Sequence, residues 1–511
     1  MLRNAFLSLA LVGVLFGDFA SLAAQAADTA KVLRVGVPSR PPGLGNPYST
    51  LPIGVINPMH TLYDGLTAIG DNREILPALA TSWEPDPNNG WVFTLRPDVV
   101  FSNGEPFNAQ TVVDVLAYLR GTDAGGYPVA NETAMIKSAE VVDDLTVRIV
   151  THQPDALLPR RMSFVFMVPM KYFSDVGVDE FGLAPGGTGP FKVKDWGLAS
   201  GSYVYERNPT SWRRSAHFDE LEFIAVGDPI SRAQAMISGQ IDLSFKLSLD
   251  QLADLDAEGF KTIARQTYSI GTWAFKQMNA DSPVADVRVR RALNLAVNRD
   301  AIAQAILNGV AVPVSQVATP DVFGYNPGVP MFPYDPDKAR GLLAEAGFPN
   351  GLKLEAIVRS DPSVPESLLI NQVVAQNLRD VGVDVTMNTT PGSRWLIMYF
   401  SGDWDDADML ETSFNNSIHG DVIRSIETAS CIKAGAFYCR EDLMPLIEES
   451  NRTLDAAERE PMLQRLVKEL HDDPPGLYLF PYFDTVAYRP TLGDMPMTGL
   501  RIDLDRITEQ P

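Results

Sequence analysis

The chain has 511 residues, of which 45% are hydrophobic and 21% are charged, and its formal net charge is −22. The composition is ordinary for a folded globular protein, and the length allows two or three domains of about 100–200 residues each. A field this negative repels nucleic acid and anionic lipid, so we expect no nucleic-acid partner.

The first residues have the pattern of a secretory signal peptide. Arg3 precedes an apolar run over residues 5–16, and Ala24-Gln25-Ala26 fits a small-x-small cleavage site. Asp18 leaves the run shorter than the ~20 residues of a membrane-spanning helix. We therefore expect cleavage near Ala26 and export of a soluble mature chain.

Strand and helix patterns alternate through the N-terminal half. Asn103-Gly104 predicts a tight hairpin turn, because both residues tolerate the positive φ that such turns require. Asn108 is placed to cap a helix over residues 109–119. Apolar residues alternate with polar ones, as in half-buried strands, over 33–37, 91–95, 141–150, 203–205 and 221–226.

The C-terminal third has the clearest α/β pattern. Asp335 and Pro336 mark the start of a helix and Gly347 marks its end. Residues 352–358 alternate as a strand, 366–381 have helical spacing, and 383–387 alternate again. This order predicts a parallel strand–helix–strand crossover. Further strands are predicted at 395–400 and 477–488.

Two cysteines, Cys431 and Cys439, lie close together in the sequence. In an oxidising compartment such a pair usually closes a small loop as a disulfide. The alternative is a metal site with two cysteine ligands, but further ligands are lacking nearby. We predict the disulfide.

Motifs for catalysis are weak. The five histidines lie singly, and neither a His-Glu-x-x-His helix nor a Gly-x-Ser-x-Gly turn occurs. The glycine-rich segment 186–190 lacks the Gly-Lys-Ser/Thr of a phosphate loop, and Pro190 removes an amide donor. We interpret these glycines as a backbone corner and expect no metal, no cofactor and no enzymatic activity.

Unlike charges beside aromatic residues indicate a binding site in the C-terminal part. Arg359 follows the strand 352–358, and ligands of open α/β sheets lie beyond the carboxyl ends of strands, so its guanidinium could hold a carboxylate. The acidic run over residues 403–408 could hold an ammonium, with Trp404 or Trp395 as an apolar or cation–π wall. The alternative is that the acidic run is a solvent-exposed loop and Arg359 an ordinary surface residue, without a role in binding. The candidate residues are Arg359, Trp395, Trp404, Asp405, Asp406 and Asp408.

Five ordered motifs resemble solute-binding proteins of ABC importers, peptide/nickel class, known as family 5. They are Leu76-Pro-Ala-Leu-Ala-Thr-Ser-Trp83, Phe93-Thr-Leu-Arg-Pro-Asp-Val-Val-Phe101 with Asn103-Gly104, Gly187-Thr-Gly-Pro-Phe191 with Glu206-Arg-Asn-Pro209 and Trp212, Ser238-Gly-Gln-Ile-Asp242, and Asp286-Val-Arg-Val-Arg-Arg-Ala-Leu293. The resemblance covers essentially the whole mature chain.

The resemblance implies a two-lobed α/β fold, type II and cluster C-like, that closes on its ligand by a hinge. A β-rich subdomain is expected as an insertion in the first lobe. The expected boundaries are a signal peptide at 1–26, lobe I at 27–65, the inserted subdomain at 66–185, lobe I again at 186–275, lobe II at 276–477, and a return to lobe I at 478–511.

The resemblance also implies a periplasmic, monomeric carrier that delivers its solute to permease subunits in the membrane. By analogy with dipeptide-binding members, Arg359 would hold the ligand carboxylate, and an aspartate of residues 404–408 would hold the ligand amine. The cysteine pair resembles a disulfide loop of such members. This sequence departs from the family at Ser102-Asn103-Gly104, around residues 275–279, and at Met409, where Asp-Pro is usual. A peptide or an opine-like conjugate is the expected ligand. A periplasmic peptide hydrolase and a nickel or metal-chelate binder are the alternatives.

Overall fold

The computed structural model describes residues 30–49, 58–71, 74–124, 127–213, 217–360, 366–433, 435–498 and 501–510. The predicted signal peptide lies outside these residues. No helix within the described ranges is long and apolar enough to cross a membrane.

A mixed ten-stranded sheet runs through the whole molecule. Its strand order is β14-β13-β15-β12-β16-β11-β1-β10-β9-β8. The bounds are β1 Val32–Val37, β8 Phe191–Asp195, β9 Ser202–Arg207, β10 Glu220–Ala225, β11 Leu243–Phe245, β12 Lys261–Phe275, β13 Leu352–Ser360, β14 Val383–Pro391, β15 Met409–Asn415 and β16 Gly476–Tyr488.

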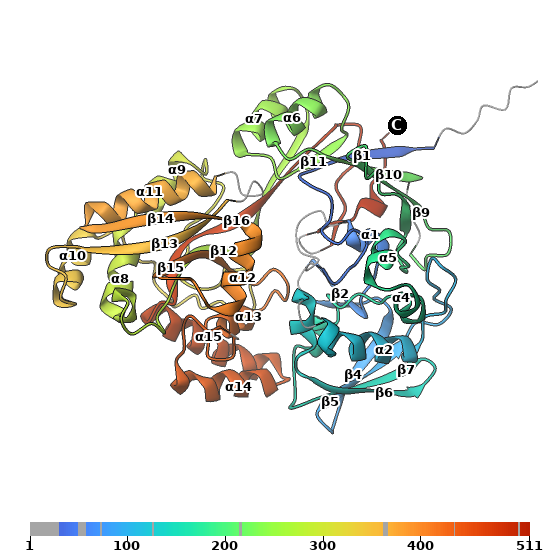
Figure 1. Ribbon diagram of the computed structural model, residues 1–511, viewed down its shortest axis with the longest axis horizontal. Coiled ribbons are helices and arrows are strands. Elements are labelled where there is room, and N and C mark those ends of the chain that lie inside the picture. The colour runs from blue at the N-terminus through green and yellow to red at the C-terminus, as the bar shows by residue number, and fades with distance from the viewer. Residues whose placement is uncertain are drawn as a thin grey trace, which may run out of the picture.

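Two long antiparallel strands, β12 and β16, join two lobes, as Figure 1 shows. The side that carries β1, β8–β11 and the N-terminal elements is called lobe I, and the side that carries β13–β15 is called lobe II. The β12–β16 pairing shifts register between Gln266 and Ile270 and again before Thr272. The predicted two-lobed α/β fold and the predicted late strand 477–488 are thereby confirmed.

Lobe I includes the β-rich part expected from the sequence. Four strands, β4 Ala80–Asp86, β5 Gly90–Leu95, β7 Thr146–Thr151 and β6 Ile136–Asp143, form an antiparallel sheet in the order β4-β5-β7-β6. Helix α2, Ala109–Leu119, packs on it through buried Val112, Val115 and Leu116. The predicted cap is confirmed, because the Asn108 side chain accepts a hydrogen bond from Thr111 N. Other elements here are β2 Thr67–Ile69, β3 Ile75–Pro77, β17 Met497–Thr498, β18 Arg501–Ile502, α1 Met59–Leu62, α3 Leu158–Arg161, α4 Met170–Val176 and α5 Val178–Leu183.

Lobe II contains the predicted parallel crossover. β13 pairs in parallel with β14 from Leu352 and Val383 onward, and α11, Ser367–Asp380, connects them. Asp335 caps α10, Pro336–Glu345, by accepting from Lys338 N, as its position in the sequence predicted. The remaining helices are α6 Pro229–Ile237 and α7 Leu249–Ala257 near the crossing strands, and α8 Val287–Ala296, α9 Arg299–Ala305, α12 Gly392–Ser401, α13 Ile423–Thr428, α14 Met444–Arg452 and α15 Ala456–Asp472 in the lobe itself.

One predicted strand is wrong. Residues 395–400 form part of helix α12. The run is apolar at nearly every position and has no strict period of two, so length and flanking residues decide between strand and helix. Pro391 precedes the helix and Gly402 ends it at a φ of 72°, a left-handed conformation that glycine adopts without strain.

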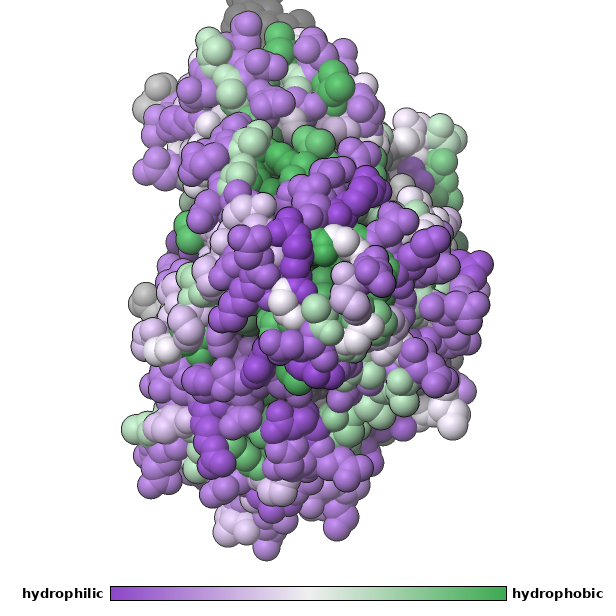
Figure 2. Space-filling model, turned by 90° about the vertical axis from the view of Figure 1, so that its left-hand side faces the viewer, coloured by the Kyte–Doolittle hydropathy of each residue, from purple (hydrophilic) through white to green (hydrophobic). Residues whose placement is uncertain are grey.

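Separate cores stabilise the two lobes. One cluster unites the lobe I sheet, the four-stranded sheet and the C-terminal segment, and includes Leu33, Phe93, Tyr205 and Ile507. Two clusters lie around and beneath the lobe II strands, including fully buried Trp273 and Trp404. Figure 2 looks onto the outer end of lobe II, where hydrophilic residues dominate and hydrophobic ones form small separate groups. Most of the apolar residues of this lobe therefore lie in its interior.

Candidate functional site

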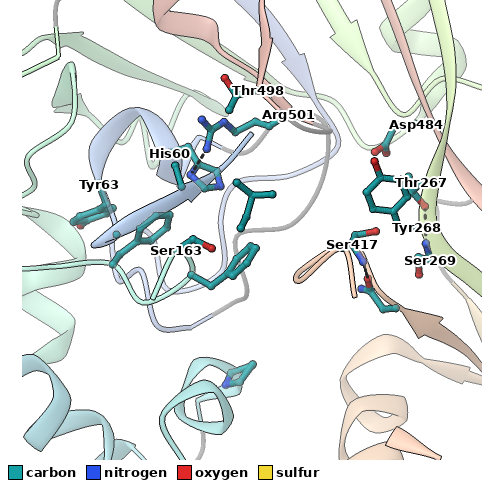
Figure 3. Close-up of a pocket in the computed structure, with 18 of the residues that line it drawn as sticks. His60, Tyr63, Ser163, Thr267, Tyr268, Ser269, Ser417, Asp484, Thr498 and Arg501 are labelled. Atoms are coloured by element: carbon teal, nitrogen blue, oxygen red, sulfur yellow. Dashed lines mark hydrogen bonds between the residues drawn. The ribbon is translucent and has the colours of Figure 1, made fainter. Parts of the chain in front are cut away.

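A cavity of about 940 Å³ lies between the two lobes, beside the crossing strands. Thr267, Tyr268 and Ser269 of β12 and Tyr482 and Asp484 of β16 line it where these strands pass from one lobe to the other. Figure 3 shows this hinge side opposite the His60 and Arg501 side chains of lobe I. A ligand here would contact both lobes and the connection between them.

Arg359 lines the lobe II wall, as predicted, and its position is set by β15 and α12. Its backbone N–H donates to Glu411 Oε2 at 2.7 Å, and its guanidinium lies 4.8 Å from the centroid of the Trp395 ring. Trp395 Nε1 donates to the Glu411 carbonyl at 2.7 Å. The indole therefore supports the guanidinium by a cation–π contact and is itself tied to the neighbouring strand.

Trp395 and Tyr399, one helical turn apart on α12, extend this wall. Their rings stack 5.1 Å apart with an interplanar angle of 11°. Lys433 Nζ lies 4.5 Å from the Tyr399 ring centroid and donates to the Tyr399 carbonyl at 2.6 Å. Burial lowers the pKa of Lys433 to about 8. The helix thus presents aromatic side chains to the cavity from a fixed position.

The predicted acidic run does not line the cavity. Asp405 is exposed and pairs with Arg394 at 2.8 Å, and Asp406 is exposed. Asp408 accepts hydrogen bonds from Glu355 N at 2.9 Å and from Ser282 Oγ. Trp404 is fully buried against Phe437, so it is not a ligand wall.

The direction of β15 explains this correction. β13 and β15 are parallel, with Ala356 opposite Met409 and Ile357 opposite Leu410. The acidic run precedes β15 and lies at its amino end, whereas Arg359 lies at the carboxyl end of β13. The residues on the same edge as Arg359 are those at the end of β15 and just after it, where Asn415 and Ser417 line the cavity. The interpretation of 395–400 as a strand had placed the run at the wrong edge.

An ionic network that the sequence analysis did not identify forms the lobe I wall. Asp64 binds Arg213 Nε at 3.1 Å and accepts from Trp212 Nε1 at 2.9 Å. Arg501 binds Asp503 at 2.9 Å and donates to His60 Nδ1 at 2.8 Å. His60 and Arg501 are 441 positions apart in the sequence, so no local pattern could connect them.

The glycine-rich segment 186–190 is a support for this wall. A Cβ on Gly187 would lie 2.0 Å from the Leu62 carbonyl oxygen, and one on Gly189 would lie 2.4 Å from that of Thr61. Thr188 Oγ1 donates to Asp64 Oδ2 at 2.7 Å. The segment packs backbone on backbone against α1 and orients Asp64. These contacts support the interpretation of residues 186–190 as a backbone corner.

A second contact between the lobes lies beside the loop that follows β15. Glu132, in the short 3-10 helix Pro128–Thr133 of lobe I, accepts from His419 Nε2 of lobe II at 2.9 Å. The exposed fractions of the two side chains are 2% and 0%. Arg161 binds Glu132 at 3.4 Å and Asp155 at 3.2 Å, and Arg160 Nη1 donates to the His419 carbonyl at 2.6 Å.

No group of three or more potential metal ligands occurs among the described residues. The pair Cys431–Cys439 forms the predicted disulfide, which excludes the alternative of a cysteine metal site.

The sequence profile of the bacterial extracellular solute-binding proteins, family 5 (middle region), matches residues 74–421, well over half of the chain. The chain belongs to family 5. The resemblance recognised in the sequence is confirmed.

Curated relatives of this family 5 protein bind different solutes. The heme-binding protein A of Haemophilus influenzae is 30% identical over 58% of this chain, and the chain spans only 59% of that protein's length. The nickel-binding periplasmic protein of Escherichia coli is 26% identical over 87% of this chain and 88% of its own length. The dipeptide-binding protein of Escherichia coli is 24% identical over 80% and 81%.

Solved structures agree on the fold. A periplasmic binding protein from Helicobacter pylori in complex with the peptide STSA has a TM-score of 0.80 at 22% identity, covering 94% of this chain and 98% of that one. A dipeptide-binding protein from Pseudoalteromonas in complex with Met-Leu has a TM-score of 0.81 at 20% identity, covering 94% and 100%. These likenesses show that the chain has the fold of these binding proteins, and the interlobe cavity is its candidate binding site.

Proposed function

We propose that this chain is the periplasmic substrate-binding component of an ABC importer. It captures a small carboxylate-bearing solute between its lobes, peptides first and opine-like conjugates next, and delivers it to the membrane permease. One observation carries the proposal: Arg359 stands at the carboxyl end of β13, inside the interlobe cavity and against the Trp395 ring. A guanidinium in this position is suited to bidentate binding of a carboxylate. The domain boundaries, signal cleavage near Ala26 and the monomeric state expected from the sequence belong to this proposal.

The rival functions lack support in the described residues. A peptide hydrolase needs a nucleophile beside a base or a metal, and neither arrangement lines the cavity. A metal-chelate binder could draw on histidine, but His419 is buried with its Nε2 bonded to Glu132. His60 lines the cavity, and its Nδ1 accepts a hydrogen bond from Arg501.

Arg359→Met tests the site. We expect this variant to bind a carboxylate ligand about 10- to 100-fold more weakly, equivalent to about 1.5–3 kcal/mol for a charge-assisted hydrogen bond. Titration calorimetry should compare each ligand with its C-terminal amide, since only the carboxylate form depends on the guanidinium. Arg394→Met is the matched control, because Arg394 is an exposed arginine of the same lobe, on α12, that pairs with Asp405 away from the cavity.

Mass spectrometry of solutes released by denaturing the purified protein would identify the natural ligand. Incubation with a peptide mixture should give stoichiometric retention without products. Accumulating hydrolysis products would overturn the carrier function, and an unchanged affinity of Arg359→Met would remove Arg359 from the site.

A further inference from the structure

The lobe II wall of the cavity carries two arginines, Arg359 and Arg424. Arg424 is the second residue of α13, which follows the loop after β15. Among the described residues that line this side, none is an aspartate or a glutamate. The carboxylates predicted to hold a ligand amine lie instead at the opposite edge of the sheet, as shown above. Among its described residues, the charged side chains of this wall are therefore the two arginines.

Arg424 retains hydrogen-bonding capacity for a ligand. Its Nε is buried and has no hydrogen-bond partner among the described residues. Its Nη1 forms an ion pair with Glu132 Oε1 at 3.7 Å, longer than a hydrogen bond, and Glu132 has closer partners in His419 at 2.9 Å and Arg161 at 3.4 Å. The Ser417 hydroxyl, on the preceding loop, also lines the cavity and lacks a partner within the described part of the chain. Figure 3 shows Ser417 on the lobe II side of the space, across from Ser163.

The carboxylates that do line the cavity already hold cations. Asp64 and Asp505 bind Arg213 at 3.1 and 3.5 Å. Asp503 binds Arg501 at 2.9 Å, and Asp484 binds Lys246 at 2.7 Å. Each of these four side chains is less than a tenth exposed. A ligand ammonium would have to separate one of these pairs, and leaving a buried charge unpaired is costly.

The net charge of the residues that line the cavity also favours an anionic ligand. Six lysines and arginines face four aspartates among the described lining residues, an excess of two positive charges in a chain whose net charge is −22. Such a local excess attracts an anion where the rest of the surface repels it. Leu396 and Phe400 of α12, exposed to 43% and 41%, add an apolar surface to the same cavity.

We propose that the ligand is a dianion without a free ammonium, such as an N-acylated amino acid or peptide with a second carboxylate. One carboxylate binds Arg359 and the other binds Arg424 with the Ser417 hydroxyl, while the apolar part lies on α12. This ligand class rests on the carrier function proposed above and narrows it.

Matched probes with the same C-terminal residue test the proposal. The dianionic probes are N-malonyl-, N-succinyl- and N-glutaryl-phenylalanine, whose spacers differ in length, and the zwitterionic probe is the dipeptide Ala-Phe. In titration calorimetry we expect one of the three dianions to bind at least about ten-fold tighter than Ala-Phe, the scale of one charge-assisted hydrogen bond. Arg424→Met should remove this advantage, and Arg424→Lys, which keeps the charge, should restore part of it.

Arg379→Met is the control, because Arg379 is an exposed arginine of the same lobe that pairs with Asp384 outside the cavity. Circular dichroism melts establish that each variant folds. Tighter binding of Ala-Phe, failure of all three dianions, or an Arg424→Met protein with full preference would overturn the proposal. If the protein then retains another solute from a periplasmic extract, only the ligand class is wrong; if it retains nothing, the carrier function fails too.

Discussion

Two acidic residues of the β15 region, Asp408 and Glu411, are hydrogen-bond acceptors that hold neighbouring segments in place. Asp408 precedes the strand and ties it to Glu355 N and Ser282 Oγ. Glu411, in the middle, is 6% exposed and accepts from Arg359 N and Ser367 Oγ. One carboxylate fixes the sheet and the other orients the arginine of the site, so neither is available to a ligand.

Asp408→Ala should therefore reduce stability and leave ligand affinity unchanged. We expect the free energy of unfolding to fall by about 1–2 kcal/mol, because the Glu355 amide and the Ser282 hydroxyl lose their acceptor. Urea denaturation followed by fluorescence measures this loss. The exposed neighbour Asp406→Ala is the control and should change stability by less than about 0.5 kcal/mol. A weakened ligand affinity in Asp408→Ala would return this residue to the binding site.

At the scale of elements, α12 combines an exposed apolar surface with support from a neighbouring loop. It presents Leu396, Ile397 and Phe400 with exposed fractions above 40%. The loop closed by Cys431–Cys439 lies against its end: Lys433 donates to the Tyr399 carbonyl, and a Cβ on Gly402 would lie 2.6 Å from the Gly435 carbonyl oxygen. A cation at the C-terminal end of a helix satisfies a free carbonyl and its partial negative charge.

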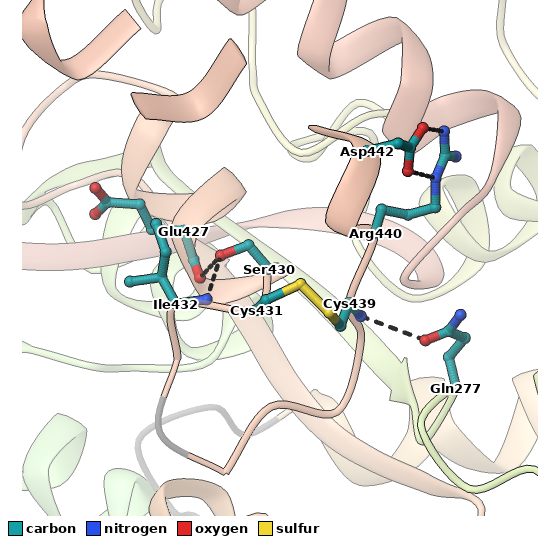
Figure 4. Close-up of a disulfide and its surroundings, with 8 residues drawn as sticks. All are labelled: Gln277, Glu427, Ser430, Cys431, Ile432, Cys439, Arg440 and Asp442. Atoms are coloured by element: carbon teal, nitrogen blue, oxygen red, sulfur yellow. Dashed lines mark hydrogen bonds and ion pairs between the residues drawn. A yellow bond between two sulfur atoms is a disulfide. The ribbon is translucent and has the colours of Figure 1, made fainter. Parts of the chain in front are cut away.

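Replacing both Cys431 and Cys439 by serine tests the contribution of this loop. Closing a loop of 8 residues is worth about 2–3 kcal/mol through the entropy of the unfolded chain, so we expect the free energy of unfolding to fall by that amount. Figure 4 shows the bridge and the Cys439 amide donating to Gln277 Oε1, at 3.3 Å. Denaturation without reductant measures the difference, and addition of reductant should affect only the native protein. Equal stability of the two proteins without reductant would contradict the prediction.

At the scale of the whole molecule, the lobes are connected through the chain and also touch through side chains. They are joined covalently by β12 and β16, and they touch through Glu132, His419 and Arg161. Phe164 of lobe I packs edge-on against the His419 ring, with centroids 6.2 Å apart. We expect the lobes to open about these strands; opening would expose this contact to water, and its charges would then contribute to the balance between open and closed forms.

Closure should weaken as the pH falls through about 6.5. Burial lowers the pKa of His419 in the closed form, although Glu132 partly opposes this shift, whereas an exposed histidine titrates near 6.5. Burial disfavours ionisation of Glu132, but the hydrogen bond from His419 and the positive charges of Arg424 and Arg161 hold the pKa of its carboxyl well below the usual range, so it stays charged. The open form therefore takes up a proton at His419 more readily, and acid favours opening.

Fluorescence energy transfer between dyes on the two lobes, measured from pH 5 to 7.5, checks this dependence. In His419→Gln the amide can still donate to Glu132 but does not titrate, so the pH dependence in this window should disappear. A closed fraction that is independent of pH in the native protein would show that His419 does not control closure.

The sequence alone determined the family, the α/β class, the parallel crossover at 352–387 and the disulfide. These depend on local signals: alternation, caps such as Asn108 and Asp335, and short motifs that keep their order along the chain. It also predicted that Arg359 lies at the carboxyl edge of the sheet, where it lines the cavity, because a residue at the end of a strand lies at this edge whatever the partners are.

Only the tertiary structure decided which other residues share the site. The apolar run 395–400 has no period that distinguishes strand from helix, and the edge at which the acidic run emerges depends on that choice. Pairs such as His60 with Arg501 and Glu132 with His419 join segments hundreds of positions apart. The first contact arises because the C-terminal segment packs into lobe I, and the second because the two lobes meet beside β12 and β16, so the charge of the cavity is a property of the fold.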